Sequence, residues 1–511
     1  MKRIVSCILT VFLFFVVTSA SLLITGYSKI CIAADGLYTV TTADGIVLKM
    51  KRYRPTPDAP FREGAQPVLL FPGILCNMNE FLTHTPEERR DAYSSMKLTP
   101  PVADWAQDDP YIQKDPMRYY SIGHYLWIKG YDPWFANYRG TGRGEFKSSR
   151  RGDTGEDNLT TLDIWATQDA PACIDKVVEV THKHPVIGGH STGGLVSYVY
   201  LQGAYIDPDE LDDGYERGYI SHVKSDPLLA ELRNSQIKGF IGIDPAGIPP
   251  LPEYINAPGF WLLMGFPVYL DFDRILEEII NPNLEGAGVM IVTVDMVFGM
   301  IHELARLDAI YGEYTQLFDL FPYLDCWYTQ NMDPYVEDFI ARYLLSSTYL
   351  RALSEYYNIG MYQSIREHWK NGAENKDIIV AGSPDPNDGY YYYDEHMYLM
   401  SVPSITVLSQ SDSLVEAEEI IRDLMEAKQP HEYDEWHLIP NTAHVDIPMG
   451  LNAPVITFPL IGEWLDKVCA EHAGAEAEED PDGTDTSTDS SAIFYKDSDE
   501  GLCFINTSRI D

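Results

Sequence analysis

The chain has 511 residues, of which 45% are hydrophobic and 22% are charged. This composition is typical of globular proteins with a large buried core, and it excludes a wholly disordered, collagen-like or disulfide-scaffold protein. The 77 acidic residues outnumber the 37 basic ones and give a net charge of −40. This charge argues against nucleic-acid binding, because that function needs a basic surface.

The first 34 residues have the pattern of an export signal. Two basic residues precede the uncharged stretch 4–28, and small residues near Ala20 and Ala34 suit cleavage by a signal peptidase. The 25 uncharged residues are also numerous enough to span a bilayer, so an uncleaved membrane anchor is the alternative. In both cases we expect the rest of the protein to be exported, as a secreted, periplasmic or surface-associated protein.

Predicted strands and helices alternate along residues 35–249, the first part of the predicted core. Short apolar runs that end at turn residues predict a hairpin at 37–54 and strands at 67–71, 131–138, 185–189 and 237–243. Helical spacing lies between them, at 159–180 and from residue 195 to about residue 203. This alternation predicts the α/β class, with a mostly parallel sheet and helices on both of its faces.

Residues 250–398 interrupt the alternation with a long segment that is aromatic and helical in pattern. We predict a helical cap, or lid, inserted before the next predicted strand, at 404–408. The apolar run 286–301 is interrupted by Asp295, which favours a buried helix over a membrane span. The four tyrosines at 390–393 follow Pro, Asp and Gly residues, and we expect them at the surface.

Residues 399–472 complete the predicted core, with strands at 404–408 and 435–439 and a final helix at 453–470. The remaining residues, 473–511, are rich in Glu, Asp, Ser, Thr and Gly. Such a composition cannot bury enough apolar surface to fold, so we predict a disordered acidic tail.

The most specific motif is Gly189-His190-Ser191-Thr192-Gly193, a G-x-S-x-G between a predicted strand and a predicted helix. A sharp strand-to-helix turn holds the serine in a strained conformation, and the flanking glycines avoid side-chain clashes there. The turn lifts the serine Oγ above the sheet at a helix N-terminus, whose partial positive charge stabilises a developing oxyanion. We therefore predict that Ser191 is a nucleophile.

A serine nucleophile needs a base, and the base needs an acid that orients it. Asp412 and His444 each follow a late predicted strand, and with Ser191 they give the order serine, acid, histidine of the nucleophile-elbow fold. Both stand at carboxyl ends of strands, where sites form in open α/β sheets. Asp244 also ends a predicted strand, so it is the alternative acid.

The rest of the predicted site consists of backbone groups. The oxyanion needs two N–H donors, which we assign to Thr192, after the nucleophile, and to Ile74, in the loop after the strand at 67–71. The seven cysteines form no CxxC pair, and no His/Cys cluster has metal-ligand spacing. We therefore expect neither a metal nor an organic cofactor.

Several stretches resemble, in chain order, the acid lipase family of gastric and lysosomal lipases within the α/β-hydrolase superfamily. They are TADGIVLKMKRYRP, LLFPGILCNMNEF, GYDPWFANYRGTGRG, IGGHSTGG, and the pair SQSDSLVEAEEI and IPNTAHVDIPMG. The resemblance covers about 37–470 and is poor within 250–360. It implies an α/β-hydrolase fold and assigns the nucleophile, acid, base and oxyanion donors to the same five residues. One departure is Pro72, where the family usually has His before the glycine.

From these features we predict a secreted serine ester hydrolase, a lipase or carboxylesterase that acts on acyl lipids through an acyl-enzyme. Its expected partners are lipid or other acyl-ester substrates, with contact to lipid aggregates through the cap. One alternative is an amide or polymer-ester hydrolase that uses the same triad. The other is a binding protein that has the fold without the chemistry.

Overall fold

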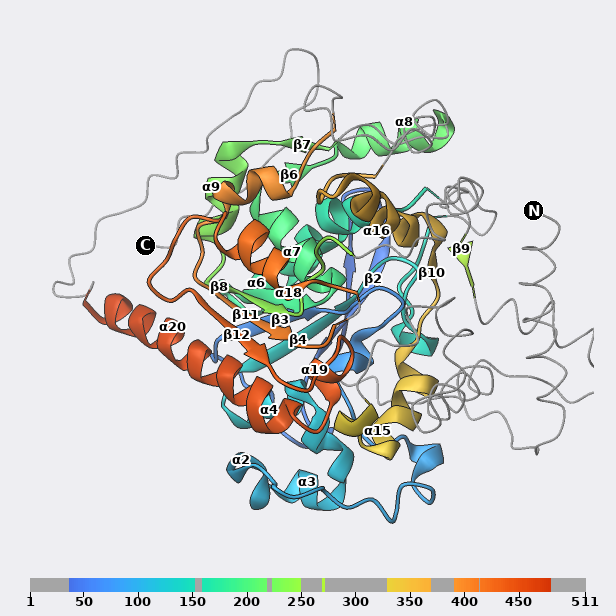
Figure 1. Ribbon diagram of the computed structural model, residues 1–511, viewed down its shortest axis with the longest axis vertical. Helices are drawn as coiled ribbons and strands as arrows, with labels where there is room; N and C mark the ends of the chain where they lie inside the picture. Colours follow the sequence, from blue (N-terminus) through green and yellow to red (C-terminus); the bar gives the residue numbers. More distant parts are fainter. Residues whose placement is uncertain are drawn as a thin grey trace, which may run out of the picture. The chain divides into compact units, whose positions relative to one another are not determined.

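The computed structural model describes residues 36–151, 159–217, 223–249, 269–271, 329–368, 390–412 and 414–478 (Figure 1). The predicted signal at 1–34, most of the predicted cap, including the run 286–301, and residues 479–511 lie outside the described residues. Tertiary contacts divide the chain into two units, Met1–Val468 and Cys469–Asp511. In the described part of the chain, no helix is both long and apolar enough to cross a membrane.

An eight-stranded sheet forms the centre of the first unit (Figure 1). From one edge to the other, its strands are β1 (Leu37–Thr41), β2 (Val47–Arg52), β4 (Asp132–Asn137), β3 (Pro67–Phe71), β5 (Val186–His190), β8 (Gly239–Ile243), β11 (Ser404–Ser409) and β12 (Glu435–Ile439). β2 pairs antiparallel with both of its neighbours, and every other pair in this sheet is parallel. The prediction of a mostly parallel α/β sheet is confirmed.

Burial on both faces explains the nearly continuous apolar sequences of the middle strands. Every residue of β3, β5, β8 and β11 is buried. The edge strand β12 instead alternates, and its Trp436 and Leu438 side chains are exposed. Because the parallel strands all run the same way, the carboxyl ends of β3, β5, β8, β11 and β12 meet at one edge of the sheet, where ligand sites of such sheets lie.

The described helices connect these strands and extend beyond them. They are α2 (Asp104–Gln107), α3 (Pro110–Lys114), α4 (Ile122–Ile128), α5 (Leu162–Ile164), α6 (Ala170–Thr181), α7 (Thr192–Leu201), α8 (Pro208–Arg217), α9 (Pro227–Ser235), α15 (Pro334–Phe339), α16 (Leu350–Tyr362), α18 (Ala417–Ile420), α19 (Asp446–Met449) and α20 (Phe458–Glu478). Short 3-10 and π turns adjoin several of them. Two small strand pairs lie apart from the main sheet: β6 (Ala204–Tyr205) with β7 (Lys224–Ser225), and β9 (Tyr269–Leu270) with β10 (Thr348–Tyr349).

Helices pack on both faces of the sheet (Figure 1). On one face, α6 and α7 pack together against β3, and all ten residues of α7 are buried. On the other face, α4 packs on β4, and Gly462 of α20 lies so close to Tyr125 of α4 that a Cβ would be 2.2 Å from the tyrosine hydroxyl. Trp464 of α20 packs in the same way on Gly239 of β8. These contacts bury the middle strands of the sheet under apolar side chains on both faces.

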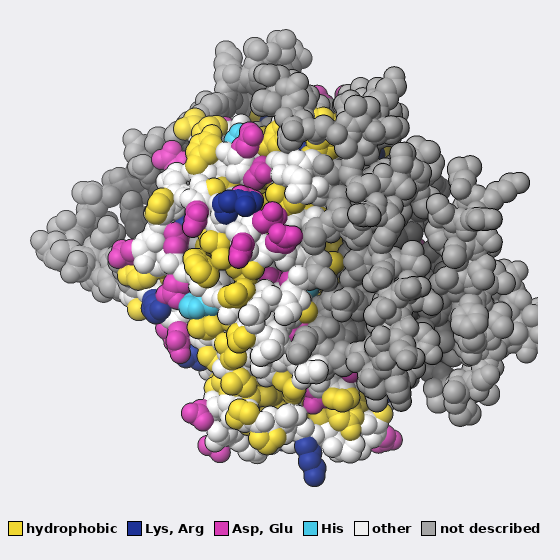
Figure 2. All heavy atoms as spheres, in the orientation of Figure 1, with side chains coloured by type: hydrophobic (Ala, Val, Ile, Leu, Met, Phe, Trp, Pro, Cys, Tyr) yellow, Lys and Arg dark blue, Asp and Glu magenta, His cyan; other side chains and the backbone are white. Residues whose placement is uncertain are grey.

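Acidic side chains are spread over the described surface. In the view of Figure 2, Asp and Glu are scattered among apolar and uncharged side chains, and Lys and Arg are fewer. This distribution accords with the net charge of −40.

The last helix is longer than expected. We predicted a helix that ends at residue 470 and a disordered tail from residue 473, but α20 continues to Glu478. The expectation was wrong at this boundary because it rested on acidic composition. The segment 473–478 reads Ala-Gly-Ala-Glu-Ala-Glu, and Ala and Glu are both strong helix formers.

Three of the four tyrosines at 390–393 are not surface residues, contrary to our expectation, and Tyr390 is partly buried. Tyr391, Tyr392 and Tyr393 are all buried, and the Tyr393 hydroxyl donates a hydrogen bond of 2.6 Å to Asp163. The preceding turn residues suggested a loop, but large aromatic rings gain free energy by burial when the hydroxyl finds a partner.

Candidate active site

Ser191 occupies a sharp turn between β5 and α7. Its backbone has φ 52° and ψ −118°, a conformation that non-glycine residues rarely adopt. A Cβ at Gly193 would lie 1.9 Å from the carbonyl oxygen of Phe71, and one at Gly189 would lie 2.1 Å from the same atom. The two glycines of the motif are therefore required because the turn presses against the end of β3.

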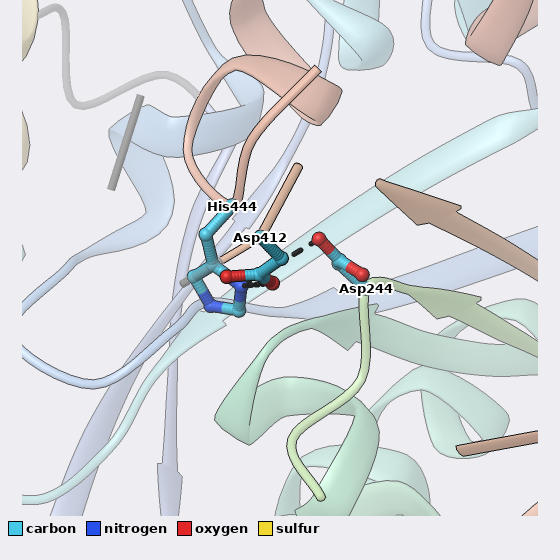
Figure 3. Close-up of side chains that lie close together, drawn as sticks. All are labelled: Asp244, Asp412 and His444. Carbon is cyan, nitrogen blue, oxygen red and sulfur yellow. Dashed lines mark hydrogen bonds and ion pairs between the residues drawn. The ribbon is translucent and has the colours of Figure 1, made fainter. Parts of the chain in front are cut away.

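His444 and Asp412 meet at the carboxyl edge of the sheet. His444 lies in the loop after β12 and Asp412 in the loop after β11, and His444 Nδ1 is 2.6 Å from Asp412 Oδ2 (Figure 3). Their side chains are 5% and 1% exposed. A carboxylate at this distance favours the tautomer with the proton on Nδ1, which leaves Nε2 able to accept a proton.

The alternative acid, Asp244, lies in the same cluster (Figure 3). It directly follows β8 and has φ 45°, and its Oδ2 is 3.6 Å from His444 Nδ1. Its carboxylate also accepts hydrogen bonds from the Ser409 backbone N–H and from the Ser409 hydroxyl. The geometry therefore favours Asp412 as the acid, because Asp412 is closer to the histidine and Asp244 is held by Ser409.

The charges of these three residues depend on one another. Burial opposes a charge on His444, but the carboxylate of Asp412 and hydrogen bonds to Asp244 and Asp412 outweigh burial and raise the pKa of the imidazole. Burial and the nearby charge of Asp412 raise the pKa of Asp244 to about 6. Burial also opposes a charge on Asp412, but His444 holds the pKa of that carboxyl below its usual value. As the pH falls, Asp244 therefore takes up a proton before Asp412 does.

Asp244, Asp412 and His444 also have the side chains of a possible metal site. Their ligand atoms lie within 4.8 Å of one another, and histidine with two carboxylates is a common donor set. A hydrogen bond of 2.6 Å needs a proton between His444 Nδ1 and Asp412, and a metal-bound nitrogen carries none. The arrangement thus fits a base and its orienting acid.

The loop after β3 lies against the nucleophile, as a loop that binds an oxyanion must. A Cβ at Gly73 would be 3.4 Å from Ser191 Cβ. The Ile74 N–H donates a hydrogen bond of 3.1 Å to Thr192 Oγ1, which is 2.5 Å from the Tyr356 hydroxyl of α16. The structure thus places the Ile74 N–H beside the side chain of Thr192, whose hydroxyl accepts the hydrogen bond that we predicted for an oxyanion.

Sequence reasoning missed three residues of this region. Tyr356 reaches the site from the predicted cap, and Glu80 and His190 form a buried ion pair of 2.6 Å beside the nucleophile. Glu80 offered one signal, because it is the sole charged residue in the segment from Pro72 to Leu82, and a charge placed among core residues needs a partner.

Comparisons with known proteins give a partial match. No family model matches the chain. Over 209 residues it is 26% identical to lipase lipl-3 of Caenorhabditis elegans, a match that covers 40% of this chain and 41% of the lipase. The matched part therefore spans about two fifths of that lipase's length.

Solved structures match over more of the chain at lower identity. A thermophilic esterase from Thermogutta terrifontis is 15% identical, with a TM-score of 0.38, and the match covers 84% of this chain and 98% of the esterase. A soluble variant of monoglyceride lipase from Saccharomyces cerevisiae is 13% identical, with a TM-score of 0.38, and the match covers 86% and 97%.

The topology itself identifies the fold and does not depend on these scores. A mostly parallel sheet in the order given above carries a strained G-x-S-x-G turn from its fifth strand to a buried helix, and the histidine follows the last strand. The predicted fold class is confirmed. The protein has the α/β-hydrolase fold and, over the matched part of the chain, is similar to a lipase.

Proposed function

We propose that the protein is a serine ester hydrolase, a lipase or carboxylesterase that cleaves acyl esters of lipids. The observation that carries this proposal is the 2.6 Å hydrogen bond from His444 to Asp412 at the same sheet edge as the strained Ser191 turn. Acyl transfer by serine needs such a raised hydroxyl and such an oriented imidazole. The partial similarity to lipase lipl-3 supports the ester-hydrolase class.

In the proposed mechanism, Ser191 Oγ attacks the ester carbonyl while His444 Nε2 takes the serine proton. Asp412 keeps the other imidazole proton on Nδ1 and stabilises the imidazolium. The backbone N–H groups of Ile74 and Thr192 donate hydrogen bonds to the oxyanion. The alcohol leaves with the proton from His444, and water then repeats both steps on the acyl-enzyme.

The proposed preference for lipid esters rests on the segment 250–398, which is far longer than an ordinary loop between strands and is rich in aromatic residues. One described part of it, α16, reaches the site through the contact of Tyr356 with Thr192. A cap in this position covers the serine and offers apolar side chains to an acyl chain or to the surface of a lipid aggregate.

The direct test is the Ser191→Ala variant, assayed on a panel of short to long acyl esters, a triglyceride, an amide and a polyester. We expect kcat for esters to fall by about 10⁴- to 10⁶-fold, because binding and the oxyanion donors alone leave only residual catalysis. The circular dichroism spectrum should match that of the wild type.

Labelling by a fluorophosphonate probe separates the alternatives. A wild-type protein labelled at Ser191 and active mainly on amides or polyesters would contradict the substrate class. A wild-type protein that is neither labelled nor active would contradict the enzyme proposal and leave the fold as a binding scaffold.

We also propose that the N-terminal 34 residues direct export. N-terminal sequencing of the mature protein, expressed as the full chain, tests this idea. A new N-terminus near Ala20 or Ala34 would mean cleavage, and an intact N-terminus in the membrane fraction would mean an anchor. Retention of the intact chain in the cytoplasm would contradict export.

A further inference from the structure

A fully buried carboxylate, Glu80, lies between the oxyanion loop and the nucleophile. Glu80 belongs to the 3-10 turn η2 (Met78–Phe81) and is 0% exposed. Its Oε2 accepts a hydrogen bond of 2.9 Å from the Gly73 N–H, and its Oε1 lies 2.6 Å from His190 Nδ1. One side chain thus contacts both the loop after β3 and the residue that precedes Ser191.

His190, the histidine of this pair, also contacts the loop that contains the proposed base, His444. His190 Nε2 lies 2.8 Å from the backbone carbonyl oxygen of His444, and the two imidazole rings are 4.6 Å apart. A carbonyl oxygen only accepts hydrogen bonds, so His190 Nε2 carries a proton and donates it. A second proton lies between His190 Nδ1 and Glu80 Oε1, because both of those atoms are acceptors without it.

Burial makes this chain of contacts stiff. His190 is 1% exposed, so neither member of the pair can exchange its partner for water. Gly73 is packed against the same imidazole, since a Cβ there would lie 3.3 Å from His190 Nδ1. Buried charged hydrogen bonds of this kind are strong when satisfied and costly when broken.

We propose that Glu80 and His190 are positioning residues. They fix the position of the loop at 72–76, which contains Gly73, relative to the loop at 441–446, which contains His444, on either side of Ser191. The inference rests on the proposed function, because those two loops carry an oxyanion donor and the base. The pair should affect kcat, because it positions the groups that react with the substrate, and should have little effect on substrate binding. A misplacement of catalytic groups by about 1 Å is enough to slow a reaction by about 10²-fold.

The first variant to measure is Glu80→Ala, with kcat expressed per active site titrated by the fluorophosphonate probe. We expect kcat to fall by about 10²-fold with KM nearly unchanged. Glu80→Gln should restore most of the rate, because glutamine accepts from the Gly73 N–H with its oxygen and donates its amide proton to His190 Nδ1. His190 then keeps its proton on Nε2 and its hydrogen bond to His444.

The matched control is Asp132→Ala, which also removes a buried carboxylate from an ion pair. Asp132 is 1% exposed and binds Arg52 at 2.8 Å. It lies where β3 and β4 begin, at the opposite end of these strands from the proposed site. We expect both alanine variants to lower the melting temperature, whereas only Glu80→Ala should lower kcat per titrated site. A purely stabilising role for Glu80 would leave that quantity at the wild-type value and would overturn the proposal.

Hydrogen exchange followed by mass spectrometry measures, without any substrate, how firmly Glu80 and His190 hold the two loops. Glu80→Ala should speed exchange in both loops, at residues 72–76 and 441–446. His190→Ala removes the hydrogen bonds to Glu80 and to His444 but leaves the bond from the Gly73 N–H to Glu80, so it should speed exchange at 441–446 more than at 72–76. Unchanged exchange in both loops would overturn the proposal even if the protein proved inactive on esters. Absence of probe labelling in the wild type would instead contradict the proposed function.

Discussion

His444 Nδ1 faces two carboxyl groups, Asp412 at 2.6 Å and Asp244 at 3.6 Å. The closer one orients the ring, and the farther one is held by the backbone and hydroxyl of Ser409. Burial and the charge of Asp412 raise the pKa of Asp244, whereas His444, against the effect of burial, lowers the pKa of Asp412. The two residues therefore differ in role, and separate substitutions distinguish them.

Substitution of the closer carboxyl, Asp412→Asn, should lower kcat by about 10⁴-fold, because the amide keeps the shape but favours the wrong tautomer of His444. Steady-state kinetics on a soluble ester measures this loss. If Asp412→Asn keeps nearly full activity while Asp244→Asn loses it, the acid must be reassigned to Asp244.

The more distant carboxyl should affect the pH dependence more than the rate. Burial opposes the charged imidazole, and Asp412 and Asp244 raise the pKa of His444 against it, so removal of the Asp244 charge lowers that pKa. The base works only when neutral, and activity is lost as the pH falls through its pKa. In Asp244→Asn we therefore expect the acid limb of the kcat/KM profile to move to lower pH. A limb that stays in place or moves to higher pH would contradict the charge assigned to Asp244.

Among the elements, the turn from β5 to α7 combines strain with close packing. Ser191 has a positive φ, and the carbonyl oxygen of Phe71 leaves no room for a Cβ at Gly189 or Gly193. Strained residues of this kind cost about 1–3 kcal/mol and persist only where the surrounding contacts hold them. Here the Ser191 N–H donates to the Ile243 carbonyl, and the Ser191 carbonyl accepts from the Ala246 N–H.

The strain can be measured with two inactive variants. Ser191→Gly and Ser191→Ala both lack the hydroxyl, but glycine adopts a positive φ without a steric penalty. We expect the free energy of unfolding in urea to be about 1 kcal/mol higher for Ser191→Gly than for Ser191→Ala. This is the net difference: the relief of strain stabilises the glycine variant, and the larger entropy of its unfolded chain offsets part of that gain. Equal stability, or a more stable alanine variant, would mean that the turn stores no strain.

For the molecule as a whole, the proposed cap determines which esters reach the serine. An apolar lid face is costly to expose to water and stabilised at a lipid surface, so opening should be coupled to the presence of an aggregate. The rate measured against substrate concentration should therefore rise where the ester passes its solubility limit. Smooth saturation through that limit, with a preference for short soluble esters, would indicate a carboxylesterase.

Prediction from sequence succeeded where one local pattern sufficed. The strands at 67–71, 185–189 and 237–243 were predictable because strands buried on both faces are continuous apolar runs. Ser191, Asp412 and His444 were named from their order and from their places after predicted strands, and the triad stays a prediction. The structure brings two of the three residues, His444 and Asp412, to hydrogen-bonding distance.

The contacts that escaped prediction join distant parts of the chain. Glu80 and His190 are 110 positions apart, and Tyr356 is 164 positions from Thr192. No local pattern in the sequence predicts contacts over such separations. The length of α20 was missed for the opposite reason, because a local propensity for helix was weighed below acidic composition.

The placement of Asp244 and Asp412 at the ends of adjacent strands has an evolutionary consequence. A lineage that loses the carboxylate at 412 still has another on the same side of the same imidazole, restrained by a single serine. Replacement of Ser409 by a residue without a hydroxyl would remove one of the two hydrogen bonds that hold that carboxylate and let it move toward the ring. Selection for activity from an Asp412→Asn parent, which keeps only residual activity, should therefore recover substitutions at Ser409, and Asp244 after β8 would then take over the role proposed for Asp412 after β11.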